Sequence, residues 1–206
     1  MLVKKTLLIA TLALCCYSLK AQYGPKVEFG LKAGLNDATM TDMGESVYGY
    51  YSRPSVNAGA LLNIKFSERS SGFALQPEVM FSGQGGAYNI DRHTYITNLD
   101  YLNVPVLLQY QFRGGFRLET GPQFGFLFNA HDDNQGNVSS YYKKSDFGWA
   151  FGGGFISRSG FGVDARFNLG LSNINNDTTP GDNEYMNNDV FQIGIFYQFG
   201  HYFSRY

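Results

Sequence analysis

The stretch KVEFGLKAGLN, residues 26–36, places an apolar residue at every second position. The apolar set runs from Val27 to Leu35, and charged, amide and glycine residues occupy the positions between. Successive side chains of a β-strand point to opposite faces, so this stretch predicts a strand with one apolar face and one polar, crowded face. Such a two-faced strand is typical of a barrel wall in a membrane.

Seven further stretches repeat this pattern, and long polar segments alternate strictly with short turns between them. The predicted strands span residues 26–36, 55–66, 73–83, 101–111, 116–127, 146–156, 161–171 and 190–200. The long segments cover residues 37–54, 84–100, 128–145 and 172–189, and the short turns cover 67–72, 112–115 and 157–160. This alternation predicts an all-β fold, an eight-stranded antiparallel up-and-down transmembrane β-barrel. With the mature N-terminus in the periplasm, the long loops are expected to face the exterior.

The apolar faces of the eight predicted strands carry no charged residue. A charge at the bilayer midplane costs a barrel about 2 to 4 kcal/mol, so a lipid-facing wall excludes it. The alternative is a soluble barrel of lipocalin type, with the apolar faces inside. Glycines such as Gly30, Gly121 and Gly152 lie on the polar face. They favour the membrane barrel, because glycine suits a cramped interior better than a solvated surface.

The first residues have the layout of a secretory signal peptide: two lysines, an apolar run over residues 6–16 and a small residue, Ala21. The apolar run is too short to cross a bilayer as a helix. We expect cleavage after Ala21. The chain then divides into a signal peptide, residues 1–21, and one outer-membrane barrel domain, residues 22–206.

A lipoprotein signal acylated at Cys15 or Cys16 is the alternative to this signal peptide. With ordinary cleavage both cysteines leave, so the mature chain holds no thiol. It then carries 13 basic and 17 acidic residues, a formal charge of −4. No basic patch predicts nucleic-acid binding, and no later apolar run is long enough for a helical span. The length fits one domain, and we expect a monomer.

Three prolines, Pro77, Pro105 and Pro122, fall inside predicted strands. Each removes one hydrogen bond from the ladder of a closed barrel. We expect β-bulges at these points, because a bulge lets the ladder resume beyond the missing bond.

Several segments are recognisable together. They are FGLKAGLN at 29–36, LQPEVMFSGQGG at 75–86, YLNVPVLLQY at 101–110, ETGPQFGFL at 119–127 and DARFNLGLSNI at 164–174. In this order and spacing, the chain resembles the PorT-like outer-membrane β-barrel family over essentially its whole mature length. The resemblance implies an eight-stranded barrel in the outer membrane of a Gram-negative bacterium. PorT itself is linked to type IX protein secretion, but fold likeness alone does not carry that role over. The tail HYFSRY after Gly200 departs from members that stop at the last strand.

The inward positions carry equal numbers of acidic and basic residues. They are Glu28, Glu78, Glu119 and Asp164 against Lys32, Lys65, Arg117 and Arg166. One interpretation is a plug of paired side chains that satisfies buried charges; the other is a charged lumen that passes ions or a small solute. Because eight strands leave an interior only just filled by side chains, we favour the plug. We therefore expect no ion conduction.

An enzyme needs a nucleophile held beside a base, as in outer-membrane lipid A deacylases or proteases built on similar barrels. His93 and His131 are expected in long loops and His201 in the tail, so no strand holds a histidine beside a serine. We therefore expect a non-enzymatic barrel and assign no catalytic residue. A paired acid such as Asp132 is more typical of a solvated turn.

Metal and cofactor sites are not expected either. The acidic and amide runs at residues 131–137 and 176–184 miss the alternating donor spacing of a calcium loop. The glycines at 152–154 lack the helix and Lys-Ser/Thr of a phosphate-binding loop. We assign no metal residue, no cofactor-binding residue and no cofactor.

Tyrosines gather in two long segments, as YGYY at residues 48–51 and YYKK at residues 141–144. They fit an interfacial girdle that meets lipid headgroups, and they also fit a surface that binds a partner. The expected partners are outer-membrane lipid and envelope or secretion proteins.

Overall fold

The computed structural model describes residues 26–42, 50–67, 71–90, 92–176 and 185–201. The expected signal peptide, residues 1–21, lies outside the described residues, as do most of the second acidic run and the tail after His201.

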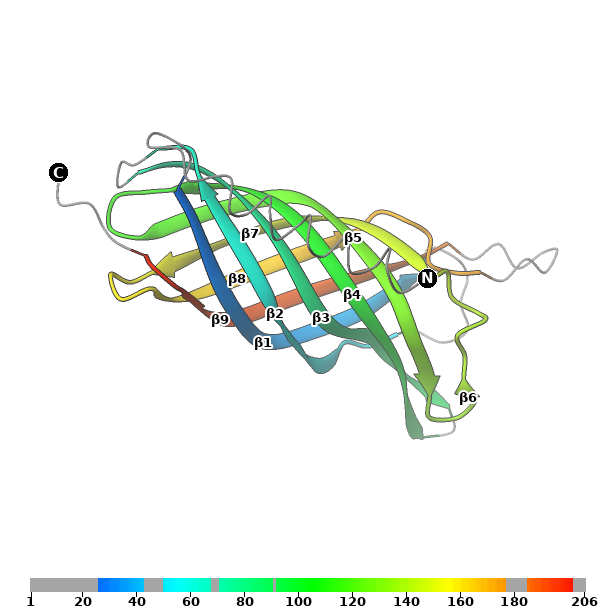
Figure 1. Cartoon of the computed structure of the whole chain (residues 1–206). Coiled ribbons are helices and arrows are strands. Elements are labelled where there is room, and N and C mark those ends of the chain that lie inside the picture. Colours follow the sequence, from blue (N-terminus) through cyan, green and yellow to red (C-terminus); the bar gives the residue numbers. More distant parts are fainter. Residues whose placement is uncertain (1–25, 43–49, 68–70, 91, 177–184, 202–206) are drawn as a thin grey trace, which may run out of the picture.

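Eight long strands form one closed antiparallel ring (Figure 1). The strands are β1 (Lys26–Asp42), β2 (Arg53–Lys65), β3 (Gly72–Ile90), β4 (His93–Gln111), β5 (Phe116–Asp132), β6 (Gly136–Asn137), β7 (Ser145–Ile156), β8 (Phe161–Gly170) and β9 (Met186–Gln198). Each long strand pairs with its neighbour in the chain, β5 with β7, and β9 closes the ring on β1. The two-residue β6 adds only to the end of β5. The predicted eight-stranded up-and-down barrel is confirmed.

The barrel has two unlike ends, which we call the short-turn end and the long-loop end. At the long-loop end, strands run further than the alternation predicts: β3 and β4 stay paired from Gly83 and Asp100 to Ile90 and His93. The expected loop over residues 84–100 is therefore wrong, and a projecting hairpin takes its place. Glycines at 83, 85 and 86 had broken the alternating pattern, while aromatic and β-branched residues nearer the turn favour strand.

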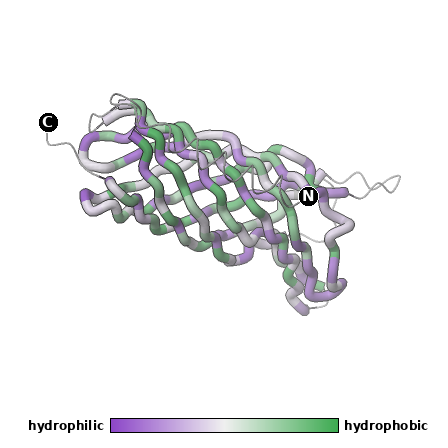
Figure 2. Tube along the Cα trace, viewed as in Figure 1, coloured by the Kyte–Doolittle hydropathy of each residue, from purple (hydrophilic) through white to green (hydrophobic). Residues whose placement is uncertain are grey.

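The outward face is the apolar one, as the alternation predicts. Leu35, Phe161 and Ile195 expose 66%, 65% and 67% of their surface, and the inward positions between such residues are buried. Figure 2 shows hydrophobic and hydrophilic residues alternating along the strands. A soluble monomer does not expose so continuous an apolar surface, so the lipocalin alternative, with its apolar faces inside, is wrong. Helices long and apolar enough to cross a membrane do not occur in the described part of the chain.

The expected bulges at the three prolines are wrong. The register between neighbouring strands is the same on both sides of Pro77, Pro105 and Pro122. Residue pairs near the prolines are missing from the ladder, but the register does not shift there. The register shifts elsewhere, between Asp100 and Tyr101 of β4. There Phe128 is the extra residue on β5, because Tyr101 pairs with Leu127 and Asp100 with Asn129.

Candidate functional site

The barrel interior holds the eight charged residues that were named as inward from the sequence. Glu28 and Lys32 come from β1, Lys65 from β2, Glu78 from β3, Arg117 and Glu119 from β5, and Asp164 and Arg166 from β8. Each occupies an inward position of its strand, and seven of them are buried, whereas Lys65 is half-buried. The lumen is therefore the candidate site, and the pairing of its charged side chains determines whether it can pass an ion.

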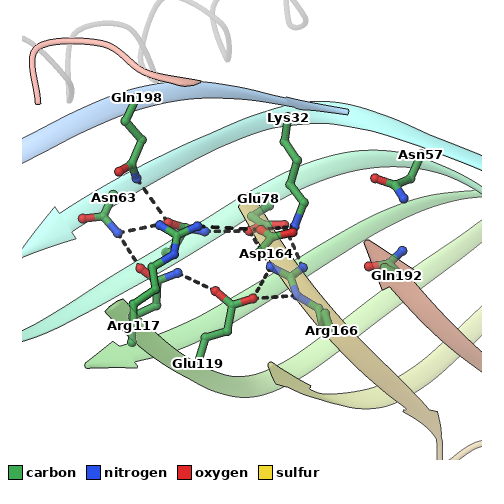
Figure 3. Close-up of polar contacts among 12 residues, drawn as sticks. Lys32, Asn57, Asn63, Glu78, Arg117, Glu119, Asp164, Arg166, Gln192 and Gln198 are labelled. Carbon is green, nitrogen blue, oxygen red and sulfur yellow. Dashed lines mark hydrogen bonds and ion pairs between the residues drawn. The ribbon is translucent and has the colours of Figure 1, made fainter. Parts of the chain in front are cut away.

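Arg166 bridges the lumen by contacting two carboxylates from other strands (Figure 3). Its Nη1 and Nη2 donate to the two oxygens of Glu78, each at 2.9 Å. Its Nε and Nη2 donate to Oε1 of Glu119 at 2.9 and 2.7 Å. This planar fork ties β8 to β3 and β5 with charge-assisted bonds, which are the strong class of hydrogen bond.

A second pairing lies beside the first. The Lys32 ammonium donates to Oδ2 of Asp164 at 2.6 Å, and Nη2 of Arg117 lies 3.7 Å from the same oxygen. The Arg117 guanidinium also lies 3.9 Å above the ring of Phe196, in the geometry of a cation–π contact. We call these six residues, Lys32, Glu78, Arg117, Glu119, Asp164 and Arg166, the charge layer.

Amide side chains complete the bonding of the charge layer. Gln76 donates to Glu78 at 2.7 Å, and Gln109 donates to Glu119 at 2.6 Å. Asn63 in turn donates to both glutamines, at 3.0 and 2.7 Å. A buried carboxylate is stable only when its oxygens are hydrogen-bonded as well as paired, and this ring of amides meets that need.

The first residue of the tail is buried at the short-turn end. Gly200 has a φ of +73°, and His201 is buried. Its Nδ1 lies 2.8 Å from Oε2 of Glu28, whose other oxygen is 3.0 Å from Nζ of Lys65. No periodicity extends past Gly200, so the sequence pattern missed this contact.

An apolar cluster, which we call the loop plug, lies at the long-loop end. It comprises Met40, Leu99, Tyr101, Leu127, Ala130, Val138, Ile174 and Met186, with Tyr50 and Tyr142 packed against it. Val138, Ile174 and the two packing tyrosines lie outside the strands, so loop segments fold over the barrel mouth. The sequence did not predict the plug. Val138 and Ile174 are single apolar residues within polar segments, and Tyr50 and Tyr142 were expected at a lipid girdle or a partner surface but pack against the cluster.

The long segments also contain two of the histidines, and their expected position was wrong. His93 opens β4 and His131 lies in β5, both exposed on strands rather than in loops. No group of three or more His, Cys, Asp or Glu side chains able to hold a metal occurs among the described residues. The run at 131–137 is instead a turn built on Asp132.

Asp132 is buried, not solvated as its sequence context suggested. One oxygen accepts bonds from Tyr88 at 3.0 Å and from the amides of Asn134 and Gln135 at 2.9 and 3.0 Å, and the other accepts from Thr97 at 2.7 Å. Burial alone would raise the pKa of Asp132, but these hydrogen bonds outweigh it and the pKa is lowered. Burial and the bond to Asp132 raise the pKa of Tyr88 to about 12.

A closed ring with an apolar outer wall and a charged interior defines an integral membrane β-barrel. The chain belongs to the outer membrane protein beta-barrel domain family, whose model matches residues 20–176. It is therefore an outer-membrane β-barrel protein.

Solved structures are similar to this chain, and that of Neisserial surface protein A has the same fold. Neisserial surface protein A is 13% identical, with 84% of this chain and 99% of that one covered and a TM-score of 0.54. The attachment invasion locus protein Ail of Yersinia pestis is 14% identical, with 84% and 99% covered and a TM-score of 0.48. OprG from Pseudomonas aeruginosa is 14% identical, with 87% and 99% covered and a TM-score of 0.42. No curated protein sequence matches this chain.

Proposed function

We propose that the protein is a non-conducting, non-enzymatic monomer that acts through its long-loop end. The observation that carries this proposal is the doubly bridged Arg166, which spans the lumen between Glu78 and Glu119. The loop plug adds a second, apolar obstruction at the long-loop end. An ion crossing the barrel would have to separate buried ion pairs and then pass an apolar cluster, and both steps are costly.

Conductance in planar bilayers tests the closed lumen. Purified protein is expected to give no single-channel steps, with a porin of known conductance as the positive control. A variant that shortens two charge-layer side chains at once, Glu78→Ala with Arg166→Ala, is expected to be more permeable if it folds. Reproducible steps from the unaltered protein would contradict the proposal.

Contacts at the long-loop end are the proposed activity. They would involve envelope or secretion proteins, in keeping with the resemblance of the chain to the PorT-like family. The variant has to keep residues 128–132 and Ser145, because they belong to β5 and β7. Replacing residues 133–144 with a short turn is expected to leave the barrel folded and to abolish a pull-down interaction. An interaction that survives would place the contact elsewhere.

The non-enzymatic role has its own test. Lipid A from cells with and without the protein is expected to have the same mass spectrum. A lost acyl chain that depends on the protein would instead establish a lipid-modifying enzyme.

A narrow pore is the second candidate, and one observation favours it. Side-chain atoms of Tyr101, Asn103 and Asn168 are buried with no hydrogen-bond partner among the described residues. Polar atoms in such a state are usually hydrated, so part of the lumen is suited to water. Swelling of protein-loaded vesicles in small sugars would separate this candidate from the closed barrel.

A further inference from the structure

Lys32 and Asp164 meet in a part of the lumen that solvent does not reach. Nζ of Lys32 lies 2.6 Å from Oδ2 of Asp164, and both side chains are 0% exposed. By contrast, Lys65 and Lys26, which lie 3.0 and 2.9 Å from Oε1 of Glu28, keep 13% and 36% of their side chains exposed. An amine and a carboxyl group held together without solvent are the two reactants of an amide bond.

This pair spans an intervening strand. Lys32 lies on β1 and Asp164 on β8, with β9 between them, and Figure 3 shows the two side chains pointing toward one another. Gly194 of β9 pairs with Asp164. A Cβ at Gly194 would lie 3.0 Å from Cε of Lys32 and 3.0 Å from Oδ1 of Asp164. The glycine therefore leaves the room in which the two side chains meet.

An unpartnered guanidinium nitrogen lies beside the same carboxyl group. Nη2 of Arg117 is 3.7 Å from Oδ2 of Asp164. This nitrogen and Oδ1 of Asp164 are both buried, and neither has a hydrogen-bond partner among the described residues. Arg166 instead donates four hydrogen bonds to its two carboxylates. A donor left without a partner beside a carboxyl group can stabilise the negative charge that develops on oxygen when a nucleophile adds to the carbon.

We propose that Lys32 and Asp164 condense into an isopeptide bond within the folded barrel. A proton passes from the ammonium to the carboxylate, and the resulting amine is the nucleophile. Its nitrogen bonds to Cγ of Asp164, the bond from Cγ to one carboxyl oxygen breaks, and that oxygen leaves as water with two of the three ammonium protons. The third proton stays on the amide nitrogen, so the step needs no oxidant, activating group or cofactor.

Two features of the site favour this condensation. The fold holds the nucleophile against the carboxyl group, which makes the step intramolecular. Taking two charges out of water is expensive, and a neutral amide removes that cost. The two arginines and two glutamates that remain in the charge layer still balance one another.

The isopeptide bond crosses the strand that closes the barrel. It joins β1 to β8 over β9, so the pairing of the last strand with the first is held by a covalent link. The two residues are 132 positions apart in the chain, so the bond also closes a long loop. An unfolded chain that carries this loop cannot extend fully.

Mass spectrometry of the purified full-length protein, unfolded before the measurement, tests the bond. The unaltered protein is expected to be lighter than its mature sequence by the mass of one water, and protease digestion is expected to yield a branched peptide that contains both residues. Lys32→Arg keeps the positive charge but removes the amine, so it is expected to show neither the mass deficit nor the branched peptide. After boiling in detergent it should also migrate more slowly in a gel, because its chain extends fully.

Lys65→Arg is the matched control, because it makes the same change at the other inward lysine that pairs with a carboxylate. It is expected to keep both the mass deficit and the branched peptide. The proposal is wrong if the unaltered protein has its full mass, a measurement that needs no variant to fold. It is also wrong if Lys32→Arg still loses the water.

The contribution of Arg117 is measured as a rate. Mature chain purified unfolded from inclusion bodies and refolded in detergent is expected to lose water as the barrel forms. Arg117→Met is expected to slow this loss about 100-fold, the usual effect of removing one donor to an oxyanion. Arg117→Lys, which returns a charged donor, is expected to recover part of the rate. An unchanged rate in Arg117→Met would overturn the assignment of Arg117 as the group that stabilises the oxyanion.

Discussion

Arg166 forms ion pairs with two buried carboxylates, so replacing it removes a partner from both. Replacing it in Arg166→Met leaves Glu78 and Glu119 without their closest cation. Removal of one partner from a buried ion pair costs about 3 to 5 kcal/mol of folding stability. Urea unfolding in lipid vesicles is expected to show a loss of this size. Arg158→Met, at an exposed turn, is the control.

Neutralising both glutamates is predicted to rescue the Arg166 variant. A triple variant that adds Glu78→Gln and Glu119→Gln to Arg166→Met removes the uncompensated charges and is expected to recover much of the lost stability. No recovery would show that Arg166 acts through packing rather than charge.

Gly162 makes room for the ring of Phe196, the residue that it pairs with on β9. A Cβ at this position would lie 1.9 Å from the ring of Phe196, and Arg117 lies on that ring at 3.9 Å, which limits its movement. Overpacking of this kind costs about 1 to 3 kcal/mol, so Gly162→Ala is expected to lower the free energy of unfolding by at least that amount. Gly153→Ala, whose Cβ would come no closer than 3.2 Å to a neighbour, is expected to cost less. Adding Phe196→Leu should restore stability to the Gly162 variant.

The loop plug determines how firmly the long loops are held against the barrel. Ile174 is fully buried there although it lies outside the strands. Ile174→Ala is expected to cost about 2 to 5 kcal/mol, confined to the long-loop end, because the ring of strands is continuous without it. Limited proteolysis should cut the long loops faster while the barrel core stays resistant. Leu171→Ala, on the exposed face, should change neither rate.

The turn between β5 and β6 is predicted to respond to acid. The pKa of Asp132 lies below its ordinary value of 3.8, so its hydrogen bonds stabilise the turn above that pH and are lost as the pH falls through the folded pKa. The carboxyl carbon shift of Asp132, followed by NMR, is expected to titrate with a midpoint below 3.8. Thr97→Val removes one donor and should move the midpoint upward; a midpoint above 3.8 in the unaltered protein would contradict this account.

Element ends and loops are where sequence analysis fell short. Alternation predicted the two faces and all eight inward charges correctly, because strand period is a local property. Which charges meet depends on the stagger of the whole ring, and Arg166 and Glu78 lie on strands that are not adjacent. Val138, Ile174 and His201 are single residues without periodic neighbours, so no local pattern predicts their burial.

At the scale of the whole molecule, the outward face can be tested with the one tryptophan. Trp149 lies on the outer wall between Phe147 and Phe151, and its Nε1 donates to Thr120 at 2.8 Å. Lipids brominated on their acyl chains are expected to quench its fluorescence in reconstituted protein. Quenching by water-soluble acrylamide alone would contradict a lipid-facing wall.

The closure of β9 on β1 sets an order on biogenesis. Gly30 pairs with Gln198 and Asp42 with Met186, so the seam joins the first strand to the last. Until the C-terminal strand arrives, both flanking strands present unsatisfied backbone groups that hydrocarbon does not tolerate. Contacts between such distant parts of a chain form slowly. The wall is therefore complete only once β9 has paired with β1, because a sheet without this seam would present two unpaired strand edges to lipid.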